Sequence, residues 1–86
     1  MTNQNLRTAA QLAPIVERVH GGHHPELTRV REITHELQQS YSAARSPELF
    51  AELREVTDNY AIPPGVCGAF EATYQALEQF DRELAA

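Results

Sequence analysis

Residues 67–84 read CGAFEATYQALEQFDREL and carry the most regular apolar spacing in the chain. Apolar side chains recur there every three or four positions, the spacing that places them on one face of an α-helix. The segment follows Ile62-Pro63-Pro64, and this proline pair favours a fresh helix start after it. We therefore predict an amphipathic helix whose buried face consists of Cys67, Phe70, Tyr74, Leu77, Phe80 (or Asp81) and Leu84.

Three earlier segments show the same helical spacing, and no segment alternates like a strand. The first runs from about Asn3 to Val19, and Pro14 inside it should kink this helix or delay its effective start. The second begins at Pro25, a residue that suits a first helical position. In the third, Ser46 is the expected N-cap, with Pro47 and Glu48 in the first turn. The predicted buried faces are Leu6, Ala9, Leu12, Val16 and Val19; then Leu27, Val30, Ile33 (or Thr34), Leu37 and Tyr41; then Phe50, Leu53, Val56 and Tyr60.

The chain of 86 residues is long enough for one domain, residues 1–86, with a single modest core. Connections of about three to six residues force neighbouring helices to run antiparallel. The predicted fold is therefore all-α, an antiparallel up-down-up-down four-helix bundle. In that topology the His20–His24 loop, the Asn59–Pro64 loop and Cys67 lie at one end of the bundle.

The amino-acid composition argues against several classes of protein, namely those that bind nucleic acid and those that contact or cross a membrane. Twelve carboxylates stand against seven arginines and no lysine, for a formal net charge of −5. This balance argues against a nucleic-acid surface or a polybasic membrane contact. No apolar run approaches the roughly 20 residues needed to cross a bilayer, and the N-terminus lacks a signal-peptide core. A lone cysteine makes no internal disulfide, so we expect a soluble cytoplasmic protein.

Three of the four histidines lie within five residues, at 20, 23 and 24. Together with Cys67, His20 and His24 are the candidate metal ligands, since imidazole and thiolate suit zinc or a similar transition metal. The competing interpretation is structural: His24 caps the second helix, His20 caps the end of the first, and His23 is solvated. Cys67 is open to two readings as well. The helix dipole would stabilise its thiolate, but its place on the apolar stripe favours a buried small hydrophobe.

Other reactive groups are few. His35-Glu36 forms a candidate acid–base pair or single ligand, although a histidine beside an apolar stripe is more often structural. Tyr41, Tyr60 and Tyr74 fall on inward positions, where each hydroxyl is expected to reach a polar group. No glycine-rich phosphate loop, Ser/His/Asp arrangement or pair of inward carboxylates can be assembled. We therefore expect a non-enzymatic protein.

Two stretches resemble a known family. They are Val16-Glu17-Arg18-Val19-His20-Gly21 with His24-Pro25-Glu26-Leu27, and Glu52-Leu53-Arg54-Glu55-Val56-Thr57-Asp58-Asn59-Tyr60 followed by Pro63-Pro64, Cys67, Tyr74, Leu77 and Phe80. Both are similar to the hemerythrin-like domain of the iron–sulfur cluster repair (repair-of-iron-centres, RIC) di-iron proteins. The resemblance implies a bundle in which histidines and glutamates from all four helices bind two irons.

The chain departs from the family pattern mainly at the positions of the histidines and glutamates that bind the two irons. The His-x-x-x-Glu of the second helix falls near Tyr41 and Arg45, and Ser46-Pro47-Glu48 replaces the Glu-His pair that opens the third. The chain begins at Met1, where the first-helix histidine would lie, and ends at Leu84-Ala85-Ala86, short of the final His-x-x-x-Glu. The expectation is a shortened hemerythrin-like bundle that has lost the di-iron site.

The resemblance implies a setting in nitrosative or oxidative stress, or in iron–sulfur cluster repair. We expect no cofactor, and action through a protein partner or self-association, because the end with Met1, Tyr41 and Leu84 would expose apolar groups. The alternative is a metal-binding protein that uses His20, His24 and Cys67 for iron or zinc, or an iron site formed between molecules. A third is a module of a larger assembly that receives its missing ligands from a partner.

Overall fold

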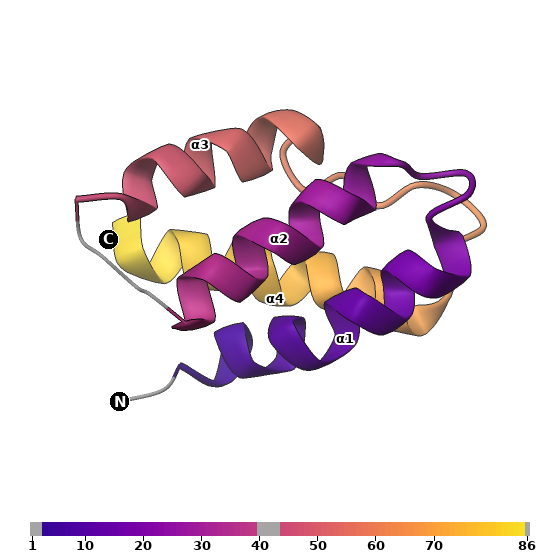
Figure 1. Ribbon diagram of the computed structural model, residues 1–86, viewed down its shortest axis with the longest axis horizontal. Helices are drawn as coiled ribbons and strands as arrows, with labels where there is room; N and C mark the ends of the chain where they lie inside the picture. The colour runs from indigo at the N-terminus through magenta and orange to yellow at the C-terminus, as the bar shows by residue number, and fades with distance from the viewer. Residues whose placement is uncertain (1–2, 40–43, 86) are drawn as a thin grey trace.

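The computed structural model describes residues 3–39 and 44–85. Four helices account for most of them: α1 (Gln4–His20), α2 (Glu26–Gln39), α3 (Ser46–Val56) and α4 (Gly68–Ala85). Over these residues no strand is present, which confirms the predicted all-helical class. The helices form a compact body of 34 × 22 × 19 Å (Figure 1). No helix among the described residues is long and apolar enough to cross a membrane.

The helices pack side by side in a definite order. α1 contacts both α2 and α4, and α2 contacts α3. The turn that joins α1 to α2 lies at one end of the body, beside the segment that leads into α4 (Figure 1). We call this end, formed by residues 20–25 and 61–67, the histidine end. At the opposite end the start of α1 lies against the end of α4, where Asn5 Nδ2 donates to Glu83 Oε1 at 2.9 Å.

α1 begins at a side-chain cap. Asn3 Oδ1 accepts hydrogen bonds from the backbone N–H groups of Asn5 and Leu6, at 2.8 and 3.2 Å, which satisfies two otherwise unpaired donors. The helix continues through Pro14, so the predicted delay of its start is wrong. Its buried residues are Leu6, Ala9, Ala13 and Val16.

The predicted stripe of α1 is wrong at its C-terminal end, where Val19 is 65% exposed. Steps of three and four from Ala9 lead through Ala13 and Val16, and the next step of four reaches His20. The face that packs on the core therefore ends on a half-buried imidazole, and Val19 points to solvent.

α2 and α3 bury the faces that their spacing predicts, with local differences. Both Ile33 and Thr34 are buried, and Thr34 satisfies its hydroxyl by donating to Val30 O at 2.7 Å. The predicted Ser46 N-cap is wrong, because Ser46 is the first helical residue and is buried, while Arg45 precedes it without a side-chain cap. Tyr41 lies outside the described residues.

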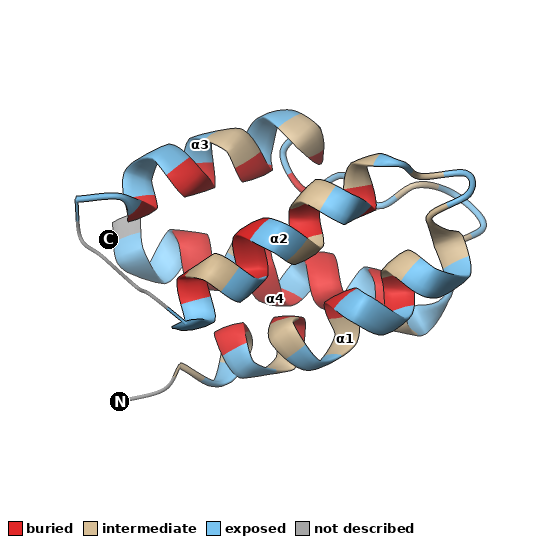
Figure 2. Ribbon diagram, viewed as in Figure 1, coloured by how far each residue is buried: buried red, intermediate tan, exposed pale blue. Residues whose placement is uncertain are grey.

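One hydrophobic cluster draws on all four helices (Figure 2). α4 supplies its centre, since Phe70, Tyr74, Leu77 and Phe80 are all buried there as predicted. Leu84 is 44% exposed, so the predicted stripe stops one turn early. Two polar residues of α4, Thr73 and Asp81, are also buried.

Candidate functional site

The histidine end brings together two of the predicted ligands. His20 Nε2 lies 3.1 Å from Cys67 Sγ, within hydrogen-bond distance. The imidazole is held by packing, because its ring meets the ring of Phe70 edge to face, with centroids 5.3 Å apart and an interplanar angle of 80°. Phe70 is fully buried near the start of α4, so it is a rigid support for the histidine ring.

The predicted capping role of the His20 side chain is wrong. The end of α1 is closed by backbone groups: Gly21 N donates to Glu17 O at 2.7 Å, and His24 N donates to His20 O at 2.9 Å. A Cβ at Gly21 would lie 2.4 Å from Glu17 O, so this tight closure requires glycine. Because backbone groups close the helix, the imidazole of His20 is available to Cys67.

The His24 ring packs on the same Phe70 ring as His20, with centroids 5.2 Å apart and an interplanar angle of 73°. His24 Nδ1 lies 3.2 Å from Glu26 Oε2, and its ring centroid is 6.5 Å from that of His20. Its backbone carbonyl accepts from Leu27 N at 3.0 Å, so His24 does cap the start of α2, through its main chain. His23 is exposed.

The expected burial of Cys67 is wrong, since the thiol is exposed. Cys67 lies one residue before α4, and its carbonyl accepts the hydrogen bond from Glu71 N at 3.2 Å. The buried face of α4 begins one turn later at Phe70. An apolar spacing counted along the sequence could not locate this helix start.

The described residues of one chain do not assemble a complete metal site. Among the described residues no group of three or more histidine, cysteine, aspartate or glutamate side chains lies close enough to hold a metal ion. The two irons that the family resemblance implies do not fit the interior either. At the end opposite the histidines, the described interior is filled by apolar side chains, with the rings of Phe50 and Phe80 packed at 5.5 Å beside Leu6, Leu37 and Leu49.

A buried carboxylate was missed by the sequence reasoning. Asp81 accepts hydrogen bonds from Arg54 Nε and Nη2 at 2.8 and 2.6 Å, and from Tyr60 Oη at 2.8 Å. Burial, and then the hydrogen bond to Asp81, raises the pKa of Tyr60 above its ordinary value. The hydrogen bond from Arg54 to Asp81 likewise raises the pKa of the guanidinium. The only sequence signal was Asp81 as an alternative to Phe80 on the stripe of α4.

The three predicted inward tyrosines have different outcomes. Tyr60 is buried and its hydroxyl is paired, as expected. Tyr74 is buried, but its hydroxyl has no hydrogen-bond partner among residues 3–39 and 44–85. Burial, and then the charge of Glu26, raises the pKa of Tyr74 above its ordinary value. Both Tyr74 and Glu26 line an open hollow of about 350 Å³ beside the 61–64 segment.

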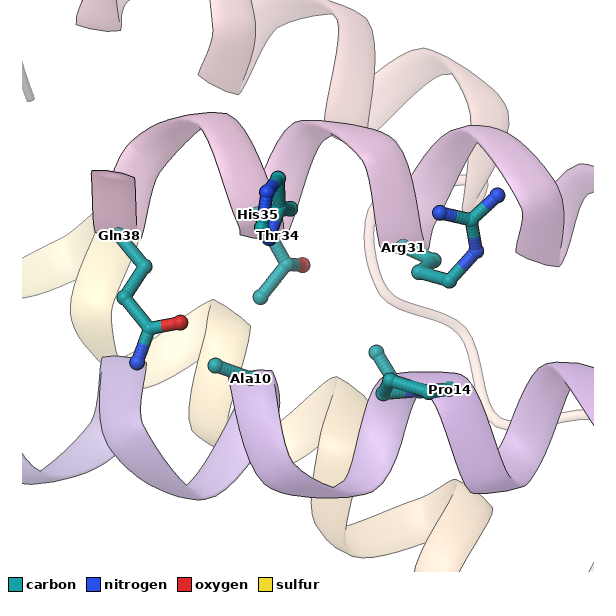
Figure 3. Close-up of a pocket in the computed structure, with 7 residues that line it drawn as sticks. Ala10, Pro14, Arg31, Thr34, His35 and Gln38 are labelled. Carbon is teal, nitrogen blue, oxygen red and sulfur yellow. The ribbon is translucent and has the colours of Figure 1, made fainter. Parts of the chain in front are cut away.

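A second hollow, of about 290 Å³, lies between α1 and α2. Its lining includes Arg31, Thr34, His35 and Gln38 of α2, and Figure 3 shows Thr34 and Gln38 reaching toward α1, which carries Ala10 and Pro14. His35 is exposed, and its neighbour Glu36 accepts from Arg45 Nε at 2.7 Å. The structure therefore pairs Glu36 with Arg45, and the sequence-predicted pair of His35 with Glu36 gains no support.

Searches against protein-family models, curated proteins and solved structures found no match to this chain.

Proposed function

We propose that this chain is a non-enzymatic, hemerythrin-like single domain without a di-iron site, which acts through protein–protein contacts. In this proposal the four helices form an antiparallel up-down-up-down bundle. The apolar filling around Phe50 and Phe80 supports the loss of the iron site, because a di-iron centre needs inward histidines and carboxylates at that level. The proposed setting, iron–sulfur cluster repair under nitrosative or oxidative stress in the cytoplasm, comes from the family resemblance.

The observation that carries the contact function is an exposed apolar face on α1. Val19 is 65% exposed and Ile15 is 44% exposed. The two residues are four apart in one helix, so they are neighbours on the same face. Ile62, 38% exposed, belongs to the segment at the same end of the body. We propose a second copy of this chain as the partner, since a two-fold arrangement lets one self-complementary patch cover both copies.

Light scattering coupled to size-exclusion chromatography tests this proposal. In chelator-treated, reducing buffer the chain is expected to associate with rising concentration toward twice its 9.6 kDa mass. Val19→Asp should weaken this association by placing a charge in the apolar patch. Ala51→Asp is the control, because Ala51 is exposed in the middle of α3 and lies outside the patch on α1. A monomer at every concentration would contradict the proposal, and so would equal weakening by both variants.

Metal binding by His20, His24 and Cys67 is the second candidate function. The 3.1 Å approach of His20 Nε2 to Cys67 Sγ favours it, since both atoms are good ligands for zinc or iron. Metal analysis of protein purified without an affinity tag tests the candidate. Stoichiometric zinc or iron that is lost on His20→Ala would support it, and metal-free protein after growth with both metals would count against it.

A further inference from the structure

We propose that His20 and Cys67 form half of a tetrahedral zinc site, and that a second copy of the chain supplies the same two ligands. The complete site would hold one zinc ion with two imidazoles and two thiolates across a two-fold axis. This inference deepens the metal-binding candidate and rests on the self-association proposed above.

The observed separation of the two ligand atoms is close to what zinc requires. Zinc binds a thiolate sulfur at about 2.3 Å and an imidazole nitrogen at about 2.0–2.1 Å. With a tetrahedral angle at the metal, these lengths place nitrogen and sulfur about 3.5 Å apart. His20 Nε2 and Cys67 Sγ are 3.1 Å apart. The pair therefore has to open by only about 0.4 Å, a change that side-chain rotation at an exposed cysteine can supply.

The fold prearranges this half site. His20 is the last residue of α1, and its ring packs on Phe70, while Cys67 directly precedes α4. The two ligands thus come from two helices that contact each other, at positions 47 residues apart in sequence. A ligand ring held by packing loses little rotational freedom when it binds a metal.

The half site needs ligands from outside the chain. His24 is the nearest further imidazole in sequence, but its ring centroid is 6.5 Å from that of His20 and its Nδ1 contacts Glu26. The described part of the chain places no third histidine, cysteine or carboxylate within reach. Structural zinc sites are closed by four protein ligands. A two-fold axis through the metal doubles one histidine and one cysteine to a Cys2His2 set.

The surface around the half site suits a second copy. Val19 adjoins His20 in sequence, and Val19 and Ile15 form an exposed apolar pair on the last two turns of α1. Two chains that each carry a formal charge of −5 repel one another. Zinc with two thiolates is neutral overall, so the metal–ligand bonds and the apolar contact have to outweigh this repulsion. The apolar patch and the metal would therefore stabilise the same pairing.

Zinc chloride added to the full, tag-free chain in reducing buffer, after chelator treatment, tests the inference. Isothermal titration calorimetry is expected to give one zinc ion per two chains. At a chain concentration where the zinc-free protein is mostly monomeric, light scattering should show dimerisation at the same ratio. Cobalt(II) in place of zinc should give the intense visible bands of a tetrahedral site and a sulfur-to-metal absorption. One zinc per chain without dimerisation would overturn the shared site and leave the single-chain metal candidate standing.

Substitution of the proposed ligands, one at a time, tests which residues bind zinc. Losing even an outer partner of a ligand costs 10–100-fold in metal affinity, so His20→Ala and Cys67→Ser should each weaken zinc binding by more than about 100-fold. His24→Ala and His23→Ala are the matched controls and should retain the stoichiometry and affinity. Circular dichroism establishes that each variant is folded. A large loss on His24→Ala would overturn the inference.

Two further outcomes separate this inference from the proposed function. Dimerisation that is unchanged by zinc and abolished by Val19→Asp would overturn the zinc site while supporting self-association. A dimer that forms without zinc and disappears on reduction would be a disulfide between two Cys67 thiols, and it would overturn the zinc site as well. Zinc-dependent dimerisation that is lost in both His20→Ala and Cys67→Ser is the expected result.

Discussion

Arg54 donates two hydrogen bonds to the carboxylate of Asp81 and thereby joins the last turn of α3 to α4. Asp81 is the more deeply buried partner, with 8% of its side chain exposed against 45% for Arg54. A carboxylate removed from water is tolerated when it is paired and hydrogen-bonded. Tyr60 supplies a third hydrogen bond from the turn that follows α3, so the same carboxylate also holds that turn in place.

Replacing Tyr60 with phenylalanine should destabilise the protein. The hydrogen bond to Asp81 has a charged acceptor, and such bonds contribute about 1.5–3 kcal/mol. We expect the free energy of unfolding in urea, followed by circular dichroism, to fall by about that amount. An unchanged free energy of unfolding would mean that water replaces the phenol at Asp81.

Replacing Tyr74 with phenylalanine is the matched comparison and should have the opposite or no effect. Its hydroxyl is buried without a partner among the described residues, and such a group carries a desolvation cost of about 1–3 kcal/mol. The variant keeps the ring, which packs at 4.8 Å on Phe70. In the same urea experiment its free energy of unfolding should equal or exceed that of the parent chain. A clear loss of stability would contradict this assignment.

Stability should fall as the pH rises above about 10. Folding raises the pKa values of Tyr60 and Tyr74 above the ordinary value of 10.0. Above that pH the unfolded chain releases these phenolic protons while the folded chain retains them. The unfolded state is therefore stabilised relative to the folded state, and the free energy of unfolding falls. Each such tyrosine contributes a slope of about 1.4 kcal/mol per pH unit. Urea unfolding at several alkaline pH values measures the slope, which Tyr74→Phe should reduce without a loss of stability at pH 7.

Acidification should also weaken the fold. Hydrogen bonds from Arg29 lower the pKa of Glu52, and hydrogen bonds from Thr28 and then Arg31 lower that of Glu17, both from 4.5. A lowered folded-state pKa stabilises the protein above the unfolded-state value, and this stabilisation is lost as pH falls through the folded-state value. The thermal midpoint should therefore drop below about pH 4.5, and less steeply in Glu52→Gln. If the thermal midpoint of Glu52→Gln depends on pH in the same way as that of the parent chain, the ion pair between Arg29 of α2 and Glu52 of α3 does not cause the loss of stability in acid.

Gly21→Ala and Gly22→Ala should differ sharply. An added Cβ at Gly21 would lie 2.4 Å from the backbone oxygen of Glu17, whereas at Gly22 it meets nothing within 4 Å. Relieving such a contact requires a backbone shift, which typically costs about 1–3 kcal/mol. Thermal unfolding should show this loss for Gly21→Ala only. Equal stability of the two variants would mean that the turn relaxes freely, and the position of His20 would then be less constrained than described.

Much of the helical architecture follows from local spacing. The periodicity of residues 67–84 predicts α4, and three further stripes predict α1, α2 and α3 with ends correct to within a few residues. Short connections also place Cys67 at the histidine end, in agreement with its contact to His20. Local spacing suffices for these features because one face of each helix has to leave water, and sequence alone determines which side chains share that face.

The exposure of a side chain and its hydrogen-bond partners depend on residues from other helices, which the apolar spacing within one helix does not reveal. Val19 continues an apolar stripe in sequence, yet His20 takes the core-facing position once α1 packs on α4. Cys67 is exposed and directly precedes α4, and within the described part of the chain no polar group reaches the hydroxyl of Tyr74.

The sequence by itself determined four amphipathic helices and most of the residues that form their apolar faces, although not where those faces end at Val19, Cys67 and Leu84. Only the tertiary structure decided which polar atoms meet, as Asp81 meets Arg54 and Tyr60, and as His20 meets Cys67. The physical reason is that the interactions differ in their directionality and in the sequence separation of the residues they join. Hydrophobic burial is non-directional and can be inferred from spacing, whereas a hydrogen bond or a metal ligand set requires distances near 3 Å between residues far apart in the chain.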